Sequence, residues 1–190
     1  MGSGTSGLYT GTRGSNAGLA FSPKGNRSGI SSSDAGKSQK YAPQYHVVDK
    51  MQKQDKADPT IWSDSSGYFK NPSAVNIQDC TRDRSVYYEG RKANGKMTYV
   101  VDTDGNLIFG KRSNPINPSA RSPHPMLIGG KDPQVRVAGM IEFRGGKIYA
   151  IDTDSGHFRP PVKSLAAAKA ALGNLPKEIF HKHFEWSSNE

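Results

Sequence analysis

Two strand–turn–strand runs constrain the fold of this chain more than any other feature of its sequence. The first, MTYVVDTDGNLIFG, spans residues 97–110, and the second, QVRVAGMIEFRGGKIYAID, spans residues 134–152. Asp-Gly and Gly-Gly supply the positive-φ positions that tight hairpin turns require, so both runs predict antiparallel β-hairpins. We therefore expect a positive φ at Gly105 and at one glycine of the Gly-Gly pair. Gly139, inside the second run, indicates a bulge or a close backbone approach.

A helix is predicted after the hairpins, over the alanine-rich residues 164–172. Alanine favours helices, Ser164 can cap the start, and Gly173 can close the end. Residues 176–184 are a candidate for a second helix, and the charged residues 49–58 for a third. The pattern predicts an α+β fold, in which a small antiparallel β-sheet of about four to six hairpin-connected strands carries one or two helices on one face.

Composition divides the chain into three parts. Residues 1–40 are rich in Gly, Ser, Asn and Lys and lack apolar periodicity, which predicts a disordered, flexible tail. Residues 41–84 are predicted to be a partly ordered extension, and residues 85–190 the catalytic or binding domain, beginning with a short strand at residues 85–88. A hydrophobic content of 34% and a mean hydropathy of −0.70 fit a small core with a polar tail.

Charge and cysteine content exclude some classes of protein and leave others open. The net charge of +9 is spread along the chain, so it favours a polyanionic partner only weakly and fits a soluble basic protein equally well. The single cysteine, Cys80, excludes an internal disulfide framework and a multi-cysteine zinc site, and is more often a packing residue than a nucleophile. No run of about 18 apolar residues is present, so no membrane-spanning helix is expected.

The strongest candidate for chemistry is the stretch TDSGHFRPPVKSL, which lies between a predicted strand and a predicted helix. Gly156 lets the backbone turn before His157, and the two prolines that follow stiffen the exit. If the segment is extended, Arg159 shares a face with His157, an arrangement that suits proton transfer beside an anion. We expect His157 at the surface of this turn. The alternative is that Ser155 and His157 only cap the turn.

A second candidate is the stretch SPHPMLIGG, in which His124 lies between two prolines that fix an extended backbone. Gly129 and Gly130 follow it, and they can either offer backbone N–H groups to an anion or form a turn. The other histidines carry less weight. His181 and His183 alternate with phenylalanines and are expected to be surface or packing residues.

Between residues 98 and 160 these segments form a longer pattern: a strand, HPMLIGG, a strand with Ala-Gly, and a hairpin that leads to SGHFRP. The pattern resembles the C-terminal domain of plant calmodulin-binding proteins of the IQM type, where His-Ser-Ser-Phe-Leu-Ala-Gly-Gly precedes an Ala-Gly strand and Ser-Gly-His-Tyr-Arg-Pro. It is also similar to C-terminal toxin modules of bacterial polymorphic toxins of the Rhs and contact-dependent kinds. The matching positions are His124, Gly129, Gly130, Gly139, Ser155, Gly156, His157, Arg159 and Pro160.

Two departures from the pattern affect what the resemblance implies. Pro125 and Met126 replace the serines that follow the histidine, and one residue fewer separates it from the glycine pair. No calmodulin-binding helix is visible, so calmodulin is not an expected partner. The Gly/Ser-rich N-terminus resembles the junction before a toxin payload, and the bacterial context is the better fit. It implies an antibacterial effector that is secreted or delivered into a target cell, acts in its cytoplasm, and is neutralised by a cognate immunity protein.

The first functional hypothesis is a ribonuclease-like toxin, a hydrolase that cleaves RNA without metal or cofactor. His124 and His157 would act as general base and general acid, and Arg159 would stabilise the charge on phosphorus. Further substrate contacts are predicted for Arg136, Gly129, Gly130 and Ser155. Four aromatic residues are candidates for stacking on bases, although most should lie in the core: Tyr99, Phe143, Tyr149 and Phe158.

Two alternatives come from other classes. One is an ADP-ribosyltransferase toxin that uses NAD as cofactor, with Glu142 or Glu89 orienting the acceptor; the 66 residues after His124 are few for that sheet arrangement. The other is a non-catalytic module that binds a protein or a phosphate group, which the plant resemblance favours. No membrane partner is expected in any of the three.

Overall fold

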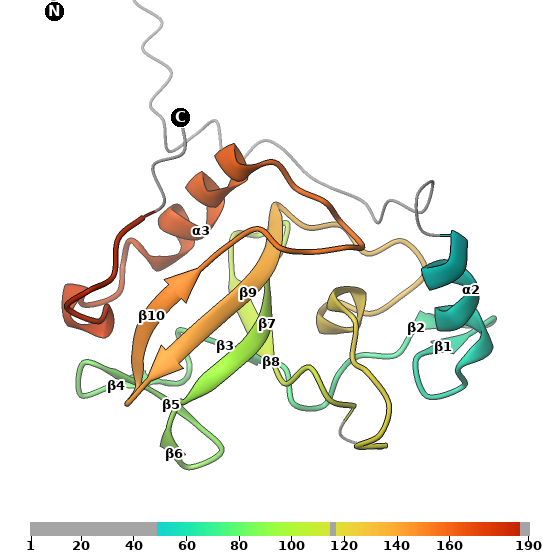
Figure 1. The fold of residues 1–190 in the computed structure, drawn as a ribbon, viewed down its shortest axis with the longest axis horizontal. Helices are drawn as coiled ribbons and strands as arrows, with labels where there is room; N and C mark the ends of the chain where they lie inside the picture. Colours follow the sequence, from blue (N-terminus) through green and yellow to red (C-terminus); the bar gives the residue numbers. More distant parts are fainter. Residues whose placement is uncertain (1–48, 115–116, 187–190) are drawn as a thin grey trace, which may run out of the picture.

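The computed structural model describes residues 49–114 and 117–186 and has an α+β fold built on a five-stranded antiparallel sheet (Figure 1). The sheet has the strand order β10–β9–β7–β8–β3. Its strands are β3 (Val75–Asn76), β7 (Gly95–Val101), β8 (Leu107–Gly110), β9 (Val137–Arg144) and β10 (Lys147–Ile151). The predicted fold class is confirmed, whereas the predicted disordered tail over residues 1–40 lies outside the described residues.

Both predicted hairpins are present, as β7–β8 and β9–β10. Gly105 has a φ of 91°, and Gly145 and Gly146 have φ values of 58° and 80°, so the predicted left-handed turn positions are confirmed. The close approach predicted at Gly139 is also confirmed, because a Cβ there would lie 2.1 Å from the backbone oxygen of Asp152. The absence of a side chain therefore lets the chain that leaves β10 lie directly against β9.

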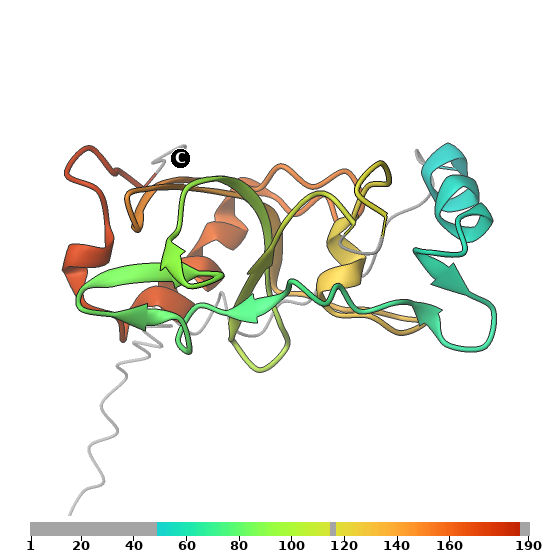
Figure 2. The same ribbon diagram turned by 90° about the horizontal axis from the view of Figure 1, so that it is seen from below.

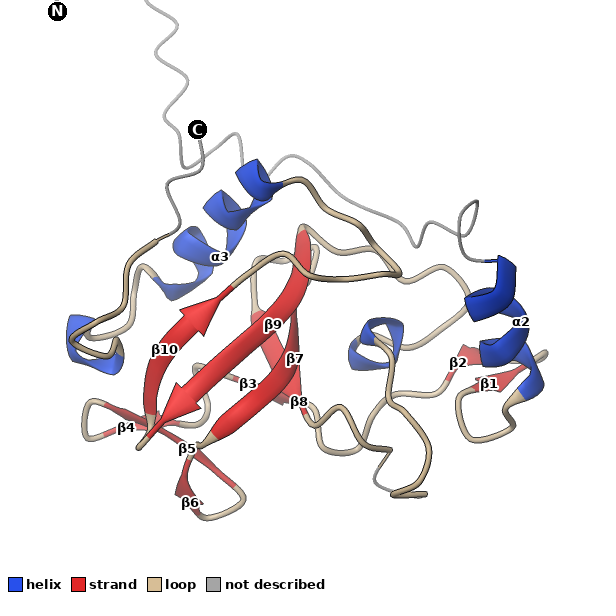
Figure 3. Cartoon of the chain, in the orientation of Figure 1, coloured by secondary structure: helices blue, strands red, loops and turns tan. Residues whose placement is uncertain are grey.

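Helix α3 (Leu165–Leu172) covers one face of the sheet and contacts β7, β8 and β9 (Figures 1 and 3). Ser164 and Gly173 stand at the two ends of this helix, as predicted, but neither makes the predicted capping interaction. Ser164 lies in a 3-10 turn, η2 (Val162–Ser164), that runs directly into the helix, and its hydroxyl donates to the Pro161 carbonyl at 2.6 Å. Gly173 has a φ of −63°, so it does not adopt the left-handed closing conformation.

The candidate helix over residues 176–184 is only a short 3-10 turn, η3 (Lys177–Ile179). Phe180 is extended and forms a bridge with Ile148 of β10, and the His181 N–H donates to the Ile148 carbonyl at 2.8 Å. Pairing with the edge of the sheet has replaced helical hydrogen bonds in this segment.

Strand alternation gives the two faces of the sheet different neighbours. Along β7, Met97, Tyr99 and Val101 belong to the large core on the α3 side, whereas Val100 belongs to a smaller cluster on the other side. The smaller cluster consists of Val100, Leu127, Val135, Ala138 and Phe158. Leu127 ends the 3-10 turn η1 (His124–Leu127), so the face opposite α3 is covered by this turn and not by a helix.

The segments before β7 form two small units at the ends of the molecule (Figure 2). The predicted charged helix is present as α2 (Asp49–Ala57), beside the hairpin of β1 (Trp62–Ser63) and β2 (Gly67–Tyr68). The second unit is a three-stranded sheet of β4 (Thr81–Arg82), β5 (Ser85–Tyr88) and β6 (Arg91–Lys92). The predicted boundary at residue 85 falls inside this sheet, and β3 before it belongs to the main sheet. No helix in the described part of the chain is long and apolar enough to span a membrane.

Candidate functional site

A pocket of about 250 Å³ opens on the sheet face opposite α3. Its sheet side is formed by Thr98 of β7 and Met140 of β9, which are paired across the two strands. His124 of η1 and His157 of the β10–α3 connection also line it. The two histidine segments singled out in the sequence therefore meet in one pocket, although 33 positions separate the histidines.

His124 is held neutral in this pocket. Its Nε2 lies 2.9 Å from the carbonyl oxygen of Gly139, and because a carbonyl only accepts, Nε2 carries the proton and Nδ1 is the basic nitrogen. Burial is the main cause that lowers the pKa of His124 from 6.5 to about 4, and the neighbouring His157 and Arg112 contribute in the same direction. His124 is thus an unprotonated imidazole near neutral pH.

His157 is held by a carboxylate that lies far away in the sequence. Its Nε2 lies 2.8 Å from Oδ2 of Asp55, a fully buried residue of α2. The Tyr68 hydroxyl donates to the same oxygen at 2.7 Å, and Arg121 forms an ion pair with the other carboxylate oxygen. Asp55 therefore fixes the orientation of the His157 ring.

The expectation that His157 lies at the surface is wrong. It is only 2% exposed, since the β10–α3 connection extends towards α2 (Figure 1) and the His157 ring contacts the buried Asp55 of that helix. Asp55, Tyr68 and Arg121 were not among the predicted site residues. Asp55 sits in a run of charged residues typical of a solvated helix, and its partner is 102 positions away.

The cations at the pocket differ from those predicted. Arg112 and Arg121 line it. Arg159 does not line it, because residues 155–159 form a turn and not an extended segment: Arg159 has a φ of 46°, and its N–H donates to the Ser155 carbonyl at 2.9 Å. Arg136 lies at the β7–β8 turn instead, where its guanidinium donates to the carbonyl oxygen of Thr103.

The other predicted substrate contacts are used within the fold. The N–H of Gly129 donates to the Pro125 carbonyl at 2.8 Å, and the N–H of Gly130 to the Tyr68 carbonyl at 2.9 Å, so this glycine pair forms a turn. The Ser155 hydroxyl accepts the N–H of Phe158 at 3.3 Å and caps its own turn. These three residues hold the histidine segments in place and do not line the pocket.

The hydroxyl groups that line the pocket are also engaged. Thr98 Oγ1 donates to the Gly110 carbonyl at 3.1 Å, and Ser122 Oγ accepts the Asn71 amide at 2.8 Å. A hydroxyl becomes a nucleophile when a histidine accepts its proton, and neither of these two hydroxyls has a histidine as its hydrogen-bond partner. The pocket is therefore better suited to direct proton transfer than to covalent catalysis.

The glutamates considered for an NAD-dependent reaction lie away from the pocket lining. Glu89 pairs with Lys111 at 2.7 Å, and Glu142 pairs with Arg144 at 2.8 Å. The acidic residue at the pocket rim is Asp154. Of the four candidate stacking aromatics, Tyr99, Phe143 and Phe158 are core residues, and Tyr149 lies outside the pocket lining, where its ring contacts Arg144 and His181.

No group of three or more His, Cys, Asp or Glu that could hold a metal ion occurs among the described residues. His181 and His183 contact each other, with ring centroids 5.3 Å apart.

Comparison with known proteins found no family model that matches this chain, and no curated protein or solved structure that matches it either.

Proposed function

We propose that this pocket cleaves RNA by metal-independent acid–base catalysis. The observation that carries the proposal is that His124 and His157 line one pocket with Arg112 and Arg121. Cleavage of RNA requires a base for the 2′-hydroxyl, an acid for the leaving 5′-oxygen, and positive charge beside the phosphate. The pocket contains side chains suited to all three tasks.

His124 is assigned the role of general base. Its Nδ1 is free of a proton, since Nε2 donates to the Gly139 carbonyl and the pKa is about 4. A base with so low a pKa accepts a proton weakly, but an anionic phosphodiester beside it raises the pKa towards neutrality. His124 takes the proton of the 2′-hydroxyl while the 2′-oxygen bonds to phosphorus.

His157 is assigned the role of general acid. The buried Asp55 carboxylate orients the ring. His157 gives its proton to the 5′-oxygen as the P–O bond breaks, which leaves a 2′,3′-cyclic phosphate and a free 5′-hydroxyl. Arg112 and Arg121 face the non-bridging phosphate oxygens, where negative charge increases during the reaction.

Pocket size favours a phosphodiester over NAD. Sites for drug-sized ligands measure roughly 300–1,000 Å³, whereas this pocket measures about 250 Å³. One phosphodiester with parts of its two sugars fits that volume better than a whole dinucleotide does. The absence of a glutamate from the pocket lining points the same way.

The resemblance to bacterial polymorphic toxin modules gives the proposed reaction a setting. In that setting the chain is an effector that reaches the cytoplasm of a target cell, and an immunity protein protects the cell that makes it. The net charge of +9 favours an RNA substrate over an uncharged one. The third hypothesis, a module that binds phosphate without turnover, requires the same pocket but predicts intact RNA.

The test is incubation of the full chain with total RNA in excess EDTA, followed by analysis of fragment ends. We expect fragments with 2′,3′-cyclic phosphates, and a loss of about 10²–10⁴-fold in rate for His157→Gln and for His124→Gln. Glutamine keeps an N–H where each histidine has Nε2, so the hydrogen bonds to Asp55 and Gly139 can persist. His183→Gln, at an exposed histidine outside the pocket, is the control.

Intact RNA in the presence of folded wild-type protein contradicts the proposal and leaves the phosphate-binding module. Release of nicotinamide from NAD by the same protein would instead support the transferase.

A further inference from the structure

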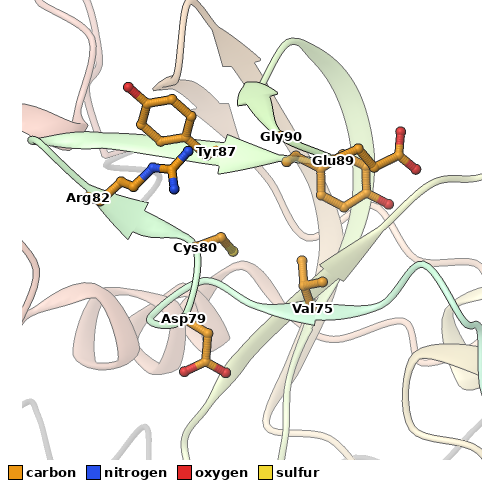
Figure 4. A pocket seen from close by; sticks show the side chains of 8 residues that line it. Val75, Asp79, Cys80, Arg82, Tyr87, Glu89 and Gly90 are labelled. Atoms are coloured by element: carbon orange, nitrogen blue, oxygen red, sulfur yellow. The ribbon is translucent and has the colours of Figure 1, made fainter.

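A second pocket, of about 240 Å³, lies between β3 and the small sheet β4–β5–β6 (Figure 4). Figure 4 shows the Arg82 guanidinium beside the Tyr87 ring on one side and Val75 on the other, with the Cys80 thiol directed into the space between them. Tyr88 also lines the pocket. Nothing in the proposed cleavage reaction uses this second pocket.

The aromatic walls are fixed in place. The Arg82 guanidinium carbon lies 4.2 Å from the centre of the Tyr87 ring, so the two planar groups support each other. The Tyr88 hydroxyl donates to the Ser73 carbonyl at 2.9 Å, and its ring packs on Phe109 with centroids 5.4 Å apart. A pocket with preformed aromatic and guanidinium walls suits a flat, aromatic ligand.

The Cys80 thiol, which is directed into the pocket, carries no charge. Burial and the neighbouring Asp79 raise the pKa of the Cys80 thiol to about 11, so it stays protonated at neutral pH. The thiol donates to the Asn76 carbonyl at 3.0 Å. Asp79 and Glu89 also line the pocket, and their negative charge together with the neutral thiol favours a heterocyclic base over a phosphate or a carboxylate.

Cations lie near the pocket, outside its lining. Lys92 and Arg91 stand opposite Tyr87 and Tyr88 in the β5–β6 register, and both are exposed. Lys111 lies over the Tyr88 ring, 5.8 Å from its centroid, and pairs with the lining residue Glu89 at 2.7 Å. Aromatic residues interleaved with exposed cations are what proteins use to hold single-stranded nucleic acid, because bases stack on the rings and phosphates face the cations.

We propose that this second pocket is a subsite for one unpaired base of a single-stranded RNA, separate from the pocket that holds the scissile phosphodiester. The inference deepens the proposed function and rests on it for the identity of the ligand. Lys111, beside the base subsite, is followed directly by Arg112, which lines the reaction pocket. One strand of RNA can therefore contact both pockets through consecutive residues of this chain.

The proposal is tested with a fluorescent single-stranded RNA decamer in which every 2′-hydroxyl is methylated. This probe cannot be cleaved by attack of a 2′-hydroxyl, so binding to the full chain is measured without turnover. Tyr87→Ala should raise the Kd about 5- to 150-fold, the range expected for the loss of one base stack. The matched control is Tyr149→Ala, because Tyr149 also stacks on an arginine, Arg144, but lies outside both pockets.

Cys80 gives a direct readout of occupancy, since it is the chain's single cysteine. Saturating decamer should slow its alkylation by a small maleimide several-fold in the wild type, and should protect Tyr87→Ala much less at the same concentration. Equal melting temperatures of the two Tyr→Ala variants establish that both are folded.

Equal Kd values for Tyr87→Ala, Tyr149→Ala and the wild type, or alkylation unchanged by bound decamer, would overturn the subsite. A different result would show that the proposed cleavage fails while the subsite holds: the decamer would still bind through Tyr87, but unmodified RNA would stay intact. Binding of a double-stranded competitor with equal affinity and equal dependence on Tyr87 also contradicts the proposal, because a paired base cannot enter the pocket.

Discussion

The two faces of the five-stranded sheet use the same strands for different purposes. On the α3 side, alternate residues of β7 pack with Phe109 and Phe143 in a large apolar core. On the other side, the intervening Thr98 borders a pocket with two buried histidines and two arginines. The face that α3 covers supplies most of the apolar burial, and the face that it leaves to a short turn and a loop can accommodate polar groups. Along β7, residues that pack in the apolar core therefore alternate with a residue that borders the pocket, because successive side chains of a strand point to opposite faces.

The largest expected effect comes from breaking the apolar face. Phe109 is fully buried, and its ring packs on Tyr88 and Phe143 with centroids 5.4 and 5.0 Å away. Phe109→Ala should lower the free energy of unfolding by about 3–5 kcal/mol, since it removes apolar contact and leaves a cavity. Urea unfolding measures the loss, and Phe69→Ala, at a 38% exposed phenylalanine, should change it little. A small loss at Phe109 would mean that the α3 face is not the stabilising one.

Acidification should lower the free energy of unfolding mainly through the buried His124 on the pocket face. The folded protein keeps His124 unprotonated down to a pH of about 4, whereas the unfolded chain protonates it below about 6.5. The unfolded state thus binds more protons in this window, so the free energy of unfolding decreases as the pH falls from about 6.5 to 4, by about 3 kcal/mol in total.

The measurement is urea unfolding at several pH values between 4 and 7. His124→Gln removes this titration and should show a weaker pH dependence across the window. An identical pH dependence in the variant and the wild type would contradict the buried, neutral state assigned to His124.

A smaller loss of stability is expected from a substitution in the turn that joins β7 to β8, which belongs to neither face of the sheet. Gly105 has a φ of 91° with open space around its Cα, so a side chain there meets strain but no clash. Gly105→Val should cost about 1 kcal/mol or more, because a β-branched residue tolerates this region poorly. Gly105→Asn should cost less, since asparagine adopts positive φ more readily. Thermal unfolding separates the two, and equal melting temperatures would contradict the strain at this turn.

The fold was predictable where local chemistry decides it. Asp-Gly and Gly-Gly determine the hairpin turns by their own conformational freedom, and alanine favours α3 without help from distant residues. Sequence reasoning failed where a distant partner decides the conformation. Phe180 pairs with Ile148 of β10, and this tertiary contact replaces the helix expected around it.

Prediction of the candidate site also succeeded for local features and failed where a distant contact decides a residue's role. Proline and glycine around His124 and His157 marked both segments, because rigid turns are visible in the sequence. Arg159 was predicted to share a face with His157, because side chains two residues apart do so in an extended chain. Its φ of 46° shows that the chain turns at Arg159 and is not extended there. Asp55 left no local signal at all, since its role depends on a contact with a residue 102 positions away.

The measurement that tests the central claim most directly is the RNA cleavage rate of the double variant His124→Gln/His157→Gln beside the two single variants. Because the two histidines act as one unit in the proposed reaction, the double variant should be only a few-fold slower than the slower single variant. Multiplied losses in the double variant would mean that the two side chains act independently. Full cleavage by either single variant would contradict the claim that this pocket performs acid–base chemistry.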